Sequence, residues 1–121
     1  FNTFVVSIGQ PVATTDNVLF NKVTATEDIC LESDLRLKDN VIRFDESLAK
    51  IEKLRGVRYE LKAKPGVPRI GLIAQEVKEI LPESVSTDAD GMMSVSYQSL
   101  IPVLIEAVKE LSERVKNLEN K

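Results

Sequence analysis

The chain has 121 residues, 43% of them hydrophobic and 29% charged, which is enough for one modest domain and too little for two large ones. A net charge of −3 argues against a nucleic-acid or anionic-membrane surface, and no apolar run approaches the roughly 18 residues that cross a bilayer. Cys30 is the only cysteine and histidine is absent, which excludes an intrachain disulfide, a histidine-based triad and the usual zinc sites. The sequence therefore predicts no metal, no cofactor and no small-molecule substrate, and it leaves lysine as the leading candidate for a general base.

Residues 1–32 are rich in Thr, Val, Asn and Asp and contain short alternations such as NVLFNKVTAT, which predict a β-rich leader. The leader carries one basic and four acidic residues, whereas residues 33–121 carry fifteen of each. We place a domain boundary at this change of composition, between Glu32 and Ser33. Because the sequence starts at Phe1, without methionine or a signal-peptide pattern, we expect the chain to be a piece of a longer protein.

A short amphipathic helix is predicted after the boundary. Its apolar residues Leu48, Ile51 and Leu54 recur at three-residue steps, with Asp45 as the candidate cap and Gly56 just past its end. The next segment, VRYEL at 57–61, alternates apolar and polar residues as a half-buried strand does.

The middle of the chain predicts a mixed α+β domain. KPGVP at 64–68 predicts a loop, and RIGLIA at 69–74 predicts a buried strand in which Gly71 allows close packing of the backbone. AQEVKEIL at 74–81 predicts a helix that Pro82 ends. SVSTDADGMMSVSY at 84–97 predicts two strands around an Asp90-Gly91 turn, with a longer DADG loop as the alternative.

The last segment, 97–118, carries a heptad pattern that predicts a coiled-coil-like helix. Ser99 is the candidate cap, which would place Pro102 in the first turn, where its missing N–H is not needed. A helix of this length is marginal alone, so its apolar seam should pack against copies of itself; the alternative is a helix folded back onto its own domain. The seam residues follow alternating steps of four and three: Tyr97, Ile101, Leu104, Val108, Leu111, Val115 and Leu118.

Four ordered blocks carry a family resemblance: SDLRLKDNV, LAKIEKLRGVRYEL, IGLIAQEVKEILPESV and SVSYQSLIPVLIEAVKEL. Over residues 33 to about 118 the sequence resembles the intramolecular chaperone auto-processing domain, of the endosialidase-type peptidase family, that ends bacteriophage tailspikes, tail fibres and neck appendages. The resemblance implies a homotrimer that assembles three β-rich fibre chains and then cuts itself off. Carried over by position, it implies Ser33 as nucleophile, Lys38 as base, and cleavage between Glu32 and Ser33.

The implied dyad has a chemical requirement. A serine hydroxyl needs a base, and a lysine can act as one only as the neutral amine. At pH 7 a lysine of ordinary pKa ~10.4 is neutral in about one molecule in 2,500, so burial must lower the pKa by around 3 units. If assembly supplies that burial, cleavage reports correct assembly.

The spacing of the dyad adds a geometric condition. On a regular helix or strand, Ser33 and Lys38 would point to different faces, so either a bend between them or a lysine from a neighbouring subunit is needed. Taken alone, Ser33 is an ordinary N-cap candidate and Lys38 an ordinary solvated lysine. Asp34 could orient the dyad or cap the next turn, and Arg36 could hold the new carboxylate or pair with Asp39.

Two further functions are considered beside the self-cleaving serine peptidase. One is a trimeric or dimeric connector that never cuts. The other is the related auto-processing domain of a membrane-anchored transcription factor, which would require a basic DNA-binding region and an apolar span. For the fibre interpretation, we expect the parent protein in the virion, with residues 1–32 as the tip of the fibre. The chaperone domain would be made in the host cytoplasm and released after cleavage.

Overall fold

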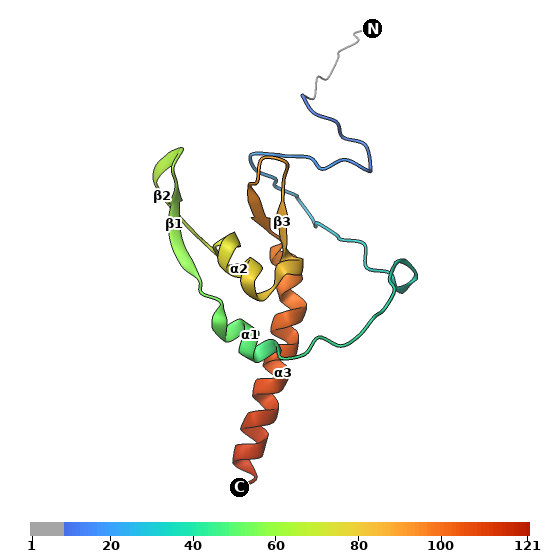
Figure 1. Ribbon diagram of the computed structural model, residues 1–121, viewed down its shortest axis with the longest axis vertical. Helices are drawn as coiled ribbons and strands as arrows, with labels where there is room; N and C mark the ends of the chain where they lie inside the picture. The colour runs from blue at the N-terminus through green and yellow to red at the C-terminus, as the bar shows by residue number, and fades with distance from the viewer. Residues whose placement is uncertain (1–8) are drawn as a thin grey trace. The chain divides into compact units, whose positions relative to one another are not determined.

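The computed structural model describes residues 9–121, and the chain divides into two units, Phe1–Asn40 and Val41–Lys121 (Figure 1). This division falls after Lys38, whereas the predicted domain boundary falls before Ser33. A boundary at residue 33 therefore stays a prediction. The part of the predicted leader at residues 1–8 lies outside the described residues.

In the first unit, the described residues form one short 3₁₀ helix, η1 (Leu35–Leu37), and no strand. Local polar contacts order the leader instead: the side-chain amide of Gln10 donates to the carbonyl of Leu19 at 2.7 Å and accepts from its N–H at 3.0 Å. A strand needs a neighbour for its backbone groups, and residues 9–32 offer one another none. The β-rich character predicted for the leader is thus not expressed as strands in residues 9–32 of a single chain.

The second unit is the predicted α+β domain, with short helices, small antiparallel hairpins and a long C-terminal helix (Figure 1). Within residues 9–121, no helix is long and apolar enough to cross a membrane. In chain order the elements are α1 (Ser47–Lys53), β1 (Val57–Leu61), β2 (Lys64–Gly71), α2 (Ala74–Ile80), η2 (Pro82–Ser84), β3 (Val85–Thr87), β4 (Met93–Val95), η3 (Tyr97–Ser99) and α3 (Leu100–Glu119).

The core of this unit lies between α2, with the residue that follows it, and the first turns of α3. Val77 and Leu81 pack there against Leu100 and Val103, and all four are buried. Burial of such side chains stabilises the fold by about 1.5–3 kcal/mol each. The partly buried hydrophobic side chains packed against these four are Phe44, Ile51, Leu54, Leu72, Ile80, Val85 and Val95.

The hairpin of β1 and β2 corrects two predictions. Residues 64–68, expected to be a loop, belong to β2, because each strand of a two-stranded ribbon is an edge that tolerates proline. The buried strand predicted at 69–74 is correct only in part: β2 ends at Gly71 and is exposed except at that glycine, while residues 72–74 lie beyond the strand and are half-buried. Gly71 does allow a close approach: a Cβ there would lie 2.7 Å from the hydroxyl of Tyr97.

The second hairpin and the helix after Gly71 follow the sequence closely. Helix α2 ends before Pro82, as predicted. Strands β3 and β4 pair antiparallel, with Thr87 opposite Met93. Residues 88–92 therefore form the longer loop that was the alternative to a tight Asp90-Gly91 turn. The Asp88 carboxylate organises that loop by accepting the N–H groups of Asp90 at 2.9 Å and Met92 at 3.0 Å, while Gly91 takes φ +82°.

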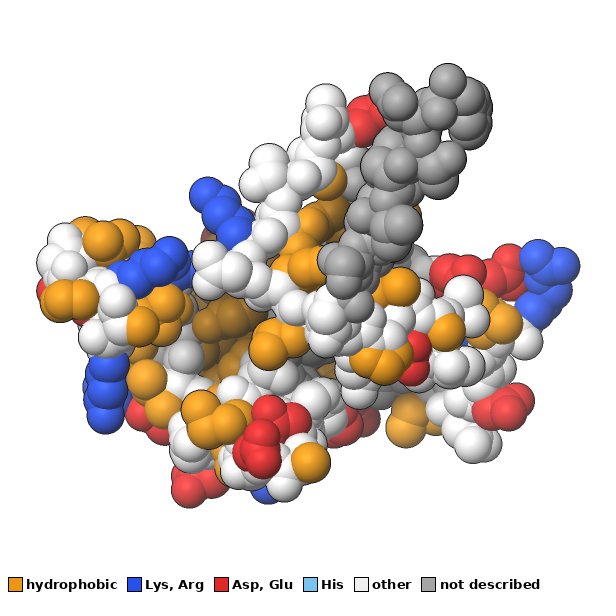
Figure 2. All heavy atoms as spheres, turned by 90° about the horizontal axis from the view of Figure 1, so that it is seen from above, with side chains coloured by type: hydrophobic (Ala, Val, Ile, Leu, Met, Phe, Trp, Pro, Cys, Tyr) orange, Lys and Arg blue, Asp and Glu red, His pale blue; other side chains and the backbone are white. Residues whose placement is uncertain are grey.

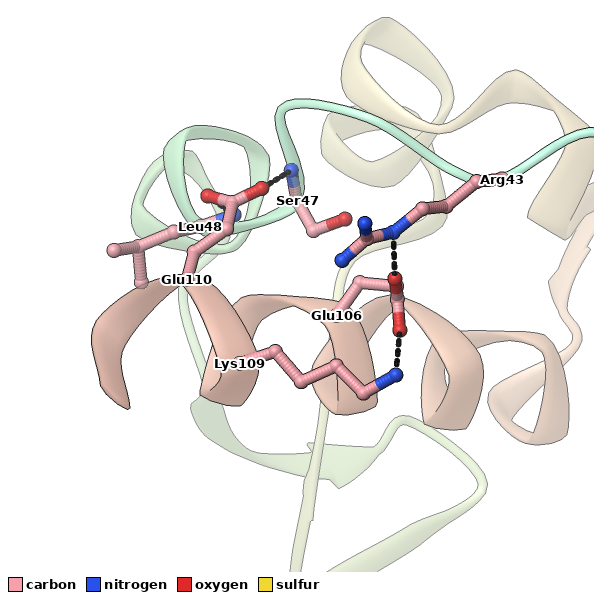
Figure 3. A network of polar contacts seen from close by, with 6 residues as sticks. All are labelled: Arg43, Ser47, Leu48, Glu106, Lys109 and Glu110. Atoms are coloured by element: carbon pink, nitrogen blue, oxygen red, sulfur yellow. Dashed lines mark hydrogen bonds and ion pairs between the residues drawn. The ribbon is translucent and has the colours of Figure 1, made fainter. Parts of the chain in front are cut away.

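Helix α1 is not capped by Asp45, so this prediction is wrong. The helix begins at Ser47, after Glu46 in the left-handed conformation at φ 57°, and no side chain of its own segment caps it. The carboxylate of Glu110 on α3 accepts the N–H groups of Ser47 at 3.0 Å and Leu48 at 3.1 Å (Figure 3). One carboxylate thus satisfies two of the donors that a helix N-terminus leaves open.

Helix α3 has two apolar faces with different surroundings. Leu100, Val103 and Ala107 are buried against the rest of the unit, and the C-terminal half of the helix projects beyond the other elements (Figure 1). Pro102 lies in the first turn, as predicted. Ser99 occupies the N-cap position without a capping bond, because its hydroxyl lies 2.7 Å from Ser84 Oγ and from the Ser96 carbonyl oxygen.

Candidate functional site

The first unit brings Ser33 and Lys38 into direct contact. The ammonium Nζ of Lys38 donates a hydrogen bond to Ser33 Oγ at 2.6 Å, within a single chain. The bend that this contact requires is η1, whose 3₁₀ turn lies between the two residues, with Lys38 extended at its C-terminal end. A regular helix or strand would have kept them apart.

The turn is held by the residue that follows Ser33. Asp34 is the N-cap of η1, and its Oδ1 accepts the backbone N–H of Arg36 at 2.9 Å. The Arg36 guanidinium donates to both carboxylate oxygens, through Nε at 3.0 Å and Nη2 at 2.9 Å. These bonds hold the pKa of the Asp34 carboxyl below its usual value. Arg36 therefore pairs with Asp34 and not with Asp39.

The surface around the dyad is open, with charged and apolar side chains side by side. A shallow depression there is lined by Glu32, Ser33, Asp34, Arg36 and Leu37. Ser33 and Lys38 are exposed, and η1 buries no residue. Four large apolar side chains of the same segment are between 60% and 74% exposed in the single chain: Ile29, Leu31, Leu35 and Leu37.

The predicted seam of α3 is exposed along its whole length. Hydrophobic side chains remain at the molecular surface beside charged ones (Figure 2), and the seven seam residues are between 45% and 66% exposed. Tyr97 differs from the other six, because it lies in η3 and its hydroxyl accepts the N–H of Leu72 at 2.9 Å. The helix thus folds back on its own domain through one face and leaves about half or more of each heptad side chain from Ile101 to Leu118 exposed to solvent.

A polar network that the sequence did not reveal joins α3 to the segment that follows the dyad (Figure 3). Arg43 donates to Glu106 at 2.6 Å, and Lys109 lies 3.2 Å from the other oxygen of the same carboxylate. These two cations lower the pKa of Glu106, Arg43 having the larger effect. The spacing of Glu106 and Glu110, one helical turn apart, is the only sequence signal that could have marked them.

Comparison with known families decides which kind of domain this is. A family model described as chaperone of endosialidase matches residues 33–86, starting at the serine of the candidate dyad. Residues 33–86 belong to the chaperone of endosialidase family. In residues 9–121, no cluster of His, Cys, Asp and Glu could hold a metal ion.

The relatives are phage fibre proteins. The chain is 40% identical over 102 residues to the long tail fiber protein Gp37 of Enterobacteria phage K3, and equally to that of phage T2. It is 33% identical over 96 residues to the Gp37 of Escherichia phage AR1. These alignments cover 78%, 78% and 72% of the chain but only 8%, 8% and 9% of the relatives. The chain thus spans less than a tenth of the length of these long proteins.

Proposed function

We propose that this domain is an intramolecular chaperone that trimerises, assists the folding of a β-rich phage tail fibre, and then releases itself by cutting between Glu32 and Ser33. The family and the fibre proteins among its relatives support the chaperone role. The proposal of cleavage rests on one observation, the 2.6 Å contact between Lys38 Nζ and Ser33 Oγ in a single chain. The parent protein would be a virion component, and its fibre chains, upstream, would be the partners.

The proposed reaction uses Ser33 as nucleophile and Lys38 as base. The neutral amine takes the hydroxyl proton, Oγ attacks the carbonyl carbon of Glu32, and the C–N bond to Ser33 breaks as its nitrogen takes the proton from the ammonium. The acyl group is then an ester on Oγ. A water molecule, deprotonated by the same amine, hydrolyses this ester to the Glu32 carboxylate and restores the Ser33 hydroxyl. The contact within one chain favours a dyad built in a single subunit.

The exposure of the dyad in one chain supports a gate that depends on assembly. A lysine works as a base only where burial depresses its pKa, and here the neighbouring apolar side chains are themselves uncovered. We propose that subunits closing over Leu35 and Leu37 remove water from the amine. Cleavage would then follow assembly.

The proposed oligomer is a homotrimer joined through the exposed seam of α3. Its alternation of β-branched residues at Ile101, Val108 and Val115 with leucines nominally favours parallel dimers. A trimer is nevertheless proposed because three fibre chains require three chaperones, and the globular part of the unit can override a short seam. Light scattering at micromolar concentration should give three subunits, and a stable dimer or monomer would contradict the proposal.

The test of cleavage is the mass and N-terminal sequence of the purified chain after incubation. We expect a fragment that begins at Ser33, and its loss in Ser33→Ala and Lys38→Ala. Lys38→Arg should fail as well, because a guanidinium stays protonated. Lys22→Ala, which removes a lysine from the leader, is the matched control and should cut normally. A Ser33→Ala protein that still yields the fragment would refute the assignment.

A connector that never cuts is the second candidate, and the open, solvated position of the dyad in a single chain favours it. Such a connector would form the same trimer and give no fragment at any time, even at a pH high enough to supply neutral amine. Trimer formation without a fragment would therefore select the connector.

A further inference from the structure

We propose that Asp34 is a positioning residue of the dyad: together with Arg36, it holds the turn that places the Lys38 amine on the Ser33 hydroxyl. This inference rests on the proposed cleavage function and adds to it a residue that never touches the scissile bond. Its basis is the way in which the Asp34 side chain closes η1.

The turn lacks the support that usually fixes a catalytic geometry. Residues 35–37 bury no side chain, so no core dictates where Ser33 and Lys38 lie. Two backbone bonds define the turn, from Leu37 N–H to the Asp34 carbonyl and from Lys38 N–H to the Leu35 carbonyl, each 3.0 Å. Such a short turn is marginal without a cap.

The Asp34 carboxylate makes three bonds within this turn. Oδ1 accepts both the backbone N–H and the Nε of Arg36, and Oδ2 accepts Nη2. An exposed ion pair alone would contribute little, and these side chains are 47% and 88% exposed. The Asp34 carboxylate does more than form an ion pair, because it also accepts the backbone N–H of Arg36. Its bonds therefore fix the first residues of η1 and the position of the Arg36 side chain.

The pairing also matters for charge. A carboxylate next to an amine favours the protonated amine, which is the wrong form for a base. The Arg36 guanidinium neutralises Asp34 through two parallel bonds, the geometry in which arginine binds carboxylates most strongly. Asp34 can thus cap the turn, and the Asp34–Arg36 pair adds no net charge beside the Lys38 amine.

The experiment measures the rate at which the full chain releases the fragment beginning at Ser33, in four variants. Asp34→Ala should slow cleavage by about tenfold, the size expected from loss of an N-cap. Asp34→Asn keeps an oxygen that can accept the Arg36 N–H and should recover most of that loss, to within about threefold of the parent. Arg36→Gln keeps the cap but leaves the Asp34 carboxylate unneutralised near the amine, so it should be slower than Asp34→Asn. The double variant Asp34→Asn with Arg36→Gln removes that charge and should return to the rate of Asp34→Asn alone.

Two controls make the result specific. Asp39→Ala removes a carboxylate one residue beyond Lys38 that forms no ion pair within residues 9–121, and it should cut at the parent rate. Hydrogen exchange of the Arg36 amide, read by mass spectrometry on an inactive Ser33→Ala background, should accelerate in Asp34→Ala and not in Asp39→Ala. This measurement reports the turn even where no cleavage occurs.

The possible failures can be told apart. If Ser33→Ala still cuts, the proposed dyad fails. If Ser33→Ala is inactive while Asp34→Ala is a trimer that cuts at the parent rate, only the positioning role fails. If Asp34→Ala does not assemble, the Asp34→Asn and Arg36→Gln variants decide the question. A loss of rate in Arg36→Gln that the added Asp34→Asn change relieves supports the role, and parent rates in all three variants overturn it.

Discussion

Different interactions stabilise the two units of this chain: apolar burial in the second, and hydrogen bonds at an exposed turn in the first. The second has a packed core, in which Val77 and Leu81 are almost fully buried against α3. The first keeps its candidate dyad on a turn that buries nothing and depends on hydrogen bonds from Asp34. The comparison teaches that the site geometry and the stability of the fold are separable here, so changes to one should leave the other measurable.

The largest effect is expected from a substitution in α3 that weakens the trimer without touching Ser33 or Lys38. Leu111→Asp places a charge in the exposed seam of α3, which should weaken the trimer while each subunit still folds, because Leu111 is already 51% exposed in the single chain. If assembly buries the dyad lysine, cleavage at pH 7 should fall by about a thousandfold, the neutral-amine fraction that roughly 3 pKa units supply. Raising the pH should restore part of the rate.

A matched variant controls for the added charge. Asn117→Asp puts the same charge on α3 outside the seam and should change neither the trimer nor the rate. A monomeric Leu111→Asp protein that cuts at the parent rate would show that the dyad works without neighbouring subunits. Cleavage could then not report assembly.

The opposite test is to damage the core. Leu81→Ala removes a side chain that is 2% exposed and should lower the free energy of unfolding by about 2–5 kcal/mol. Urea denaturation followed by circular dichroism measures this loss. At a urea concentration where the variant remains folded, exchange of the Arg36 amide should match the parent, and a parallel loss of protection there would contradict the separation.

What the sequence could predict follows from how far apart the interacting residues are. The apolar residues of helices α2 and α3 repeat at short intervals, so local sequence patterns predicted both helices. The N-terminus of α1 is capped by Glu110, 63 residues beyond Ser47, and no residue near Asp45 indicates this contact. Residues 64–68 were misread because their prolines and glycine usually mark a loop, whereas an exposed ribbon accepts them. The dyad residues came from the family resemblance, and their contact depends on a 3₁₀ turn that spacing could not specify.

A smaller effect is expected at the junction of α1 and α3. Glu110→Ala leaves the N–H groups of Ser47 and Leu48 without their acceptor, and Ser47 is fully buried. An unpaired buried donor costs about 1–3 kcal/mol, which should appear as a lower urea midpoint. Glu110→Gln retains an acceptor oxygen and should lose less, while Glu113→Ala on the same helix is the control. Equal stability of Glu110→Ala and the parent would show that water replaces the carboxylate.

The smallest expected effect is a pH dependence from the neighbouring carboxylate. Arg43 and then Lys109 lower the pKa of Glu106 below its ordinary value of 4.5 in the folded protein. A depressed carboxyl pKa stabilises the fold fully above the unfolded value, and this contribution is lost as the pH falls below about 4.5 through the folded pKa. Glu106→Gln removes the titrating group but keeps an oxygen for the Arg43 bond, so its stability should fall less steeply over that acidic range. If the urea midpoints of the two proteins fall with the same slope below pH 4.5, the Arg43 and Lys109 contacts do not contribute to acid sensitivity.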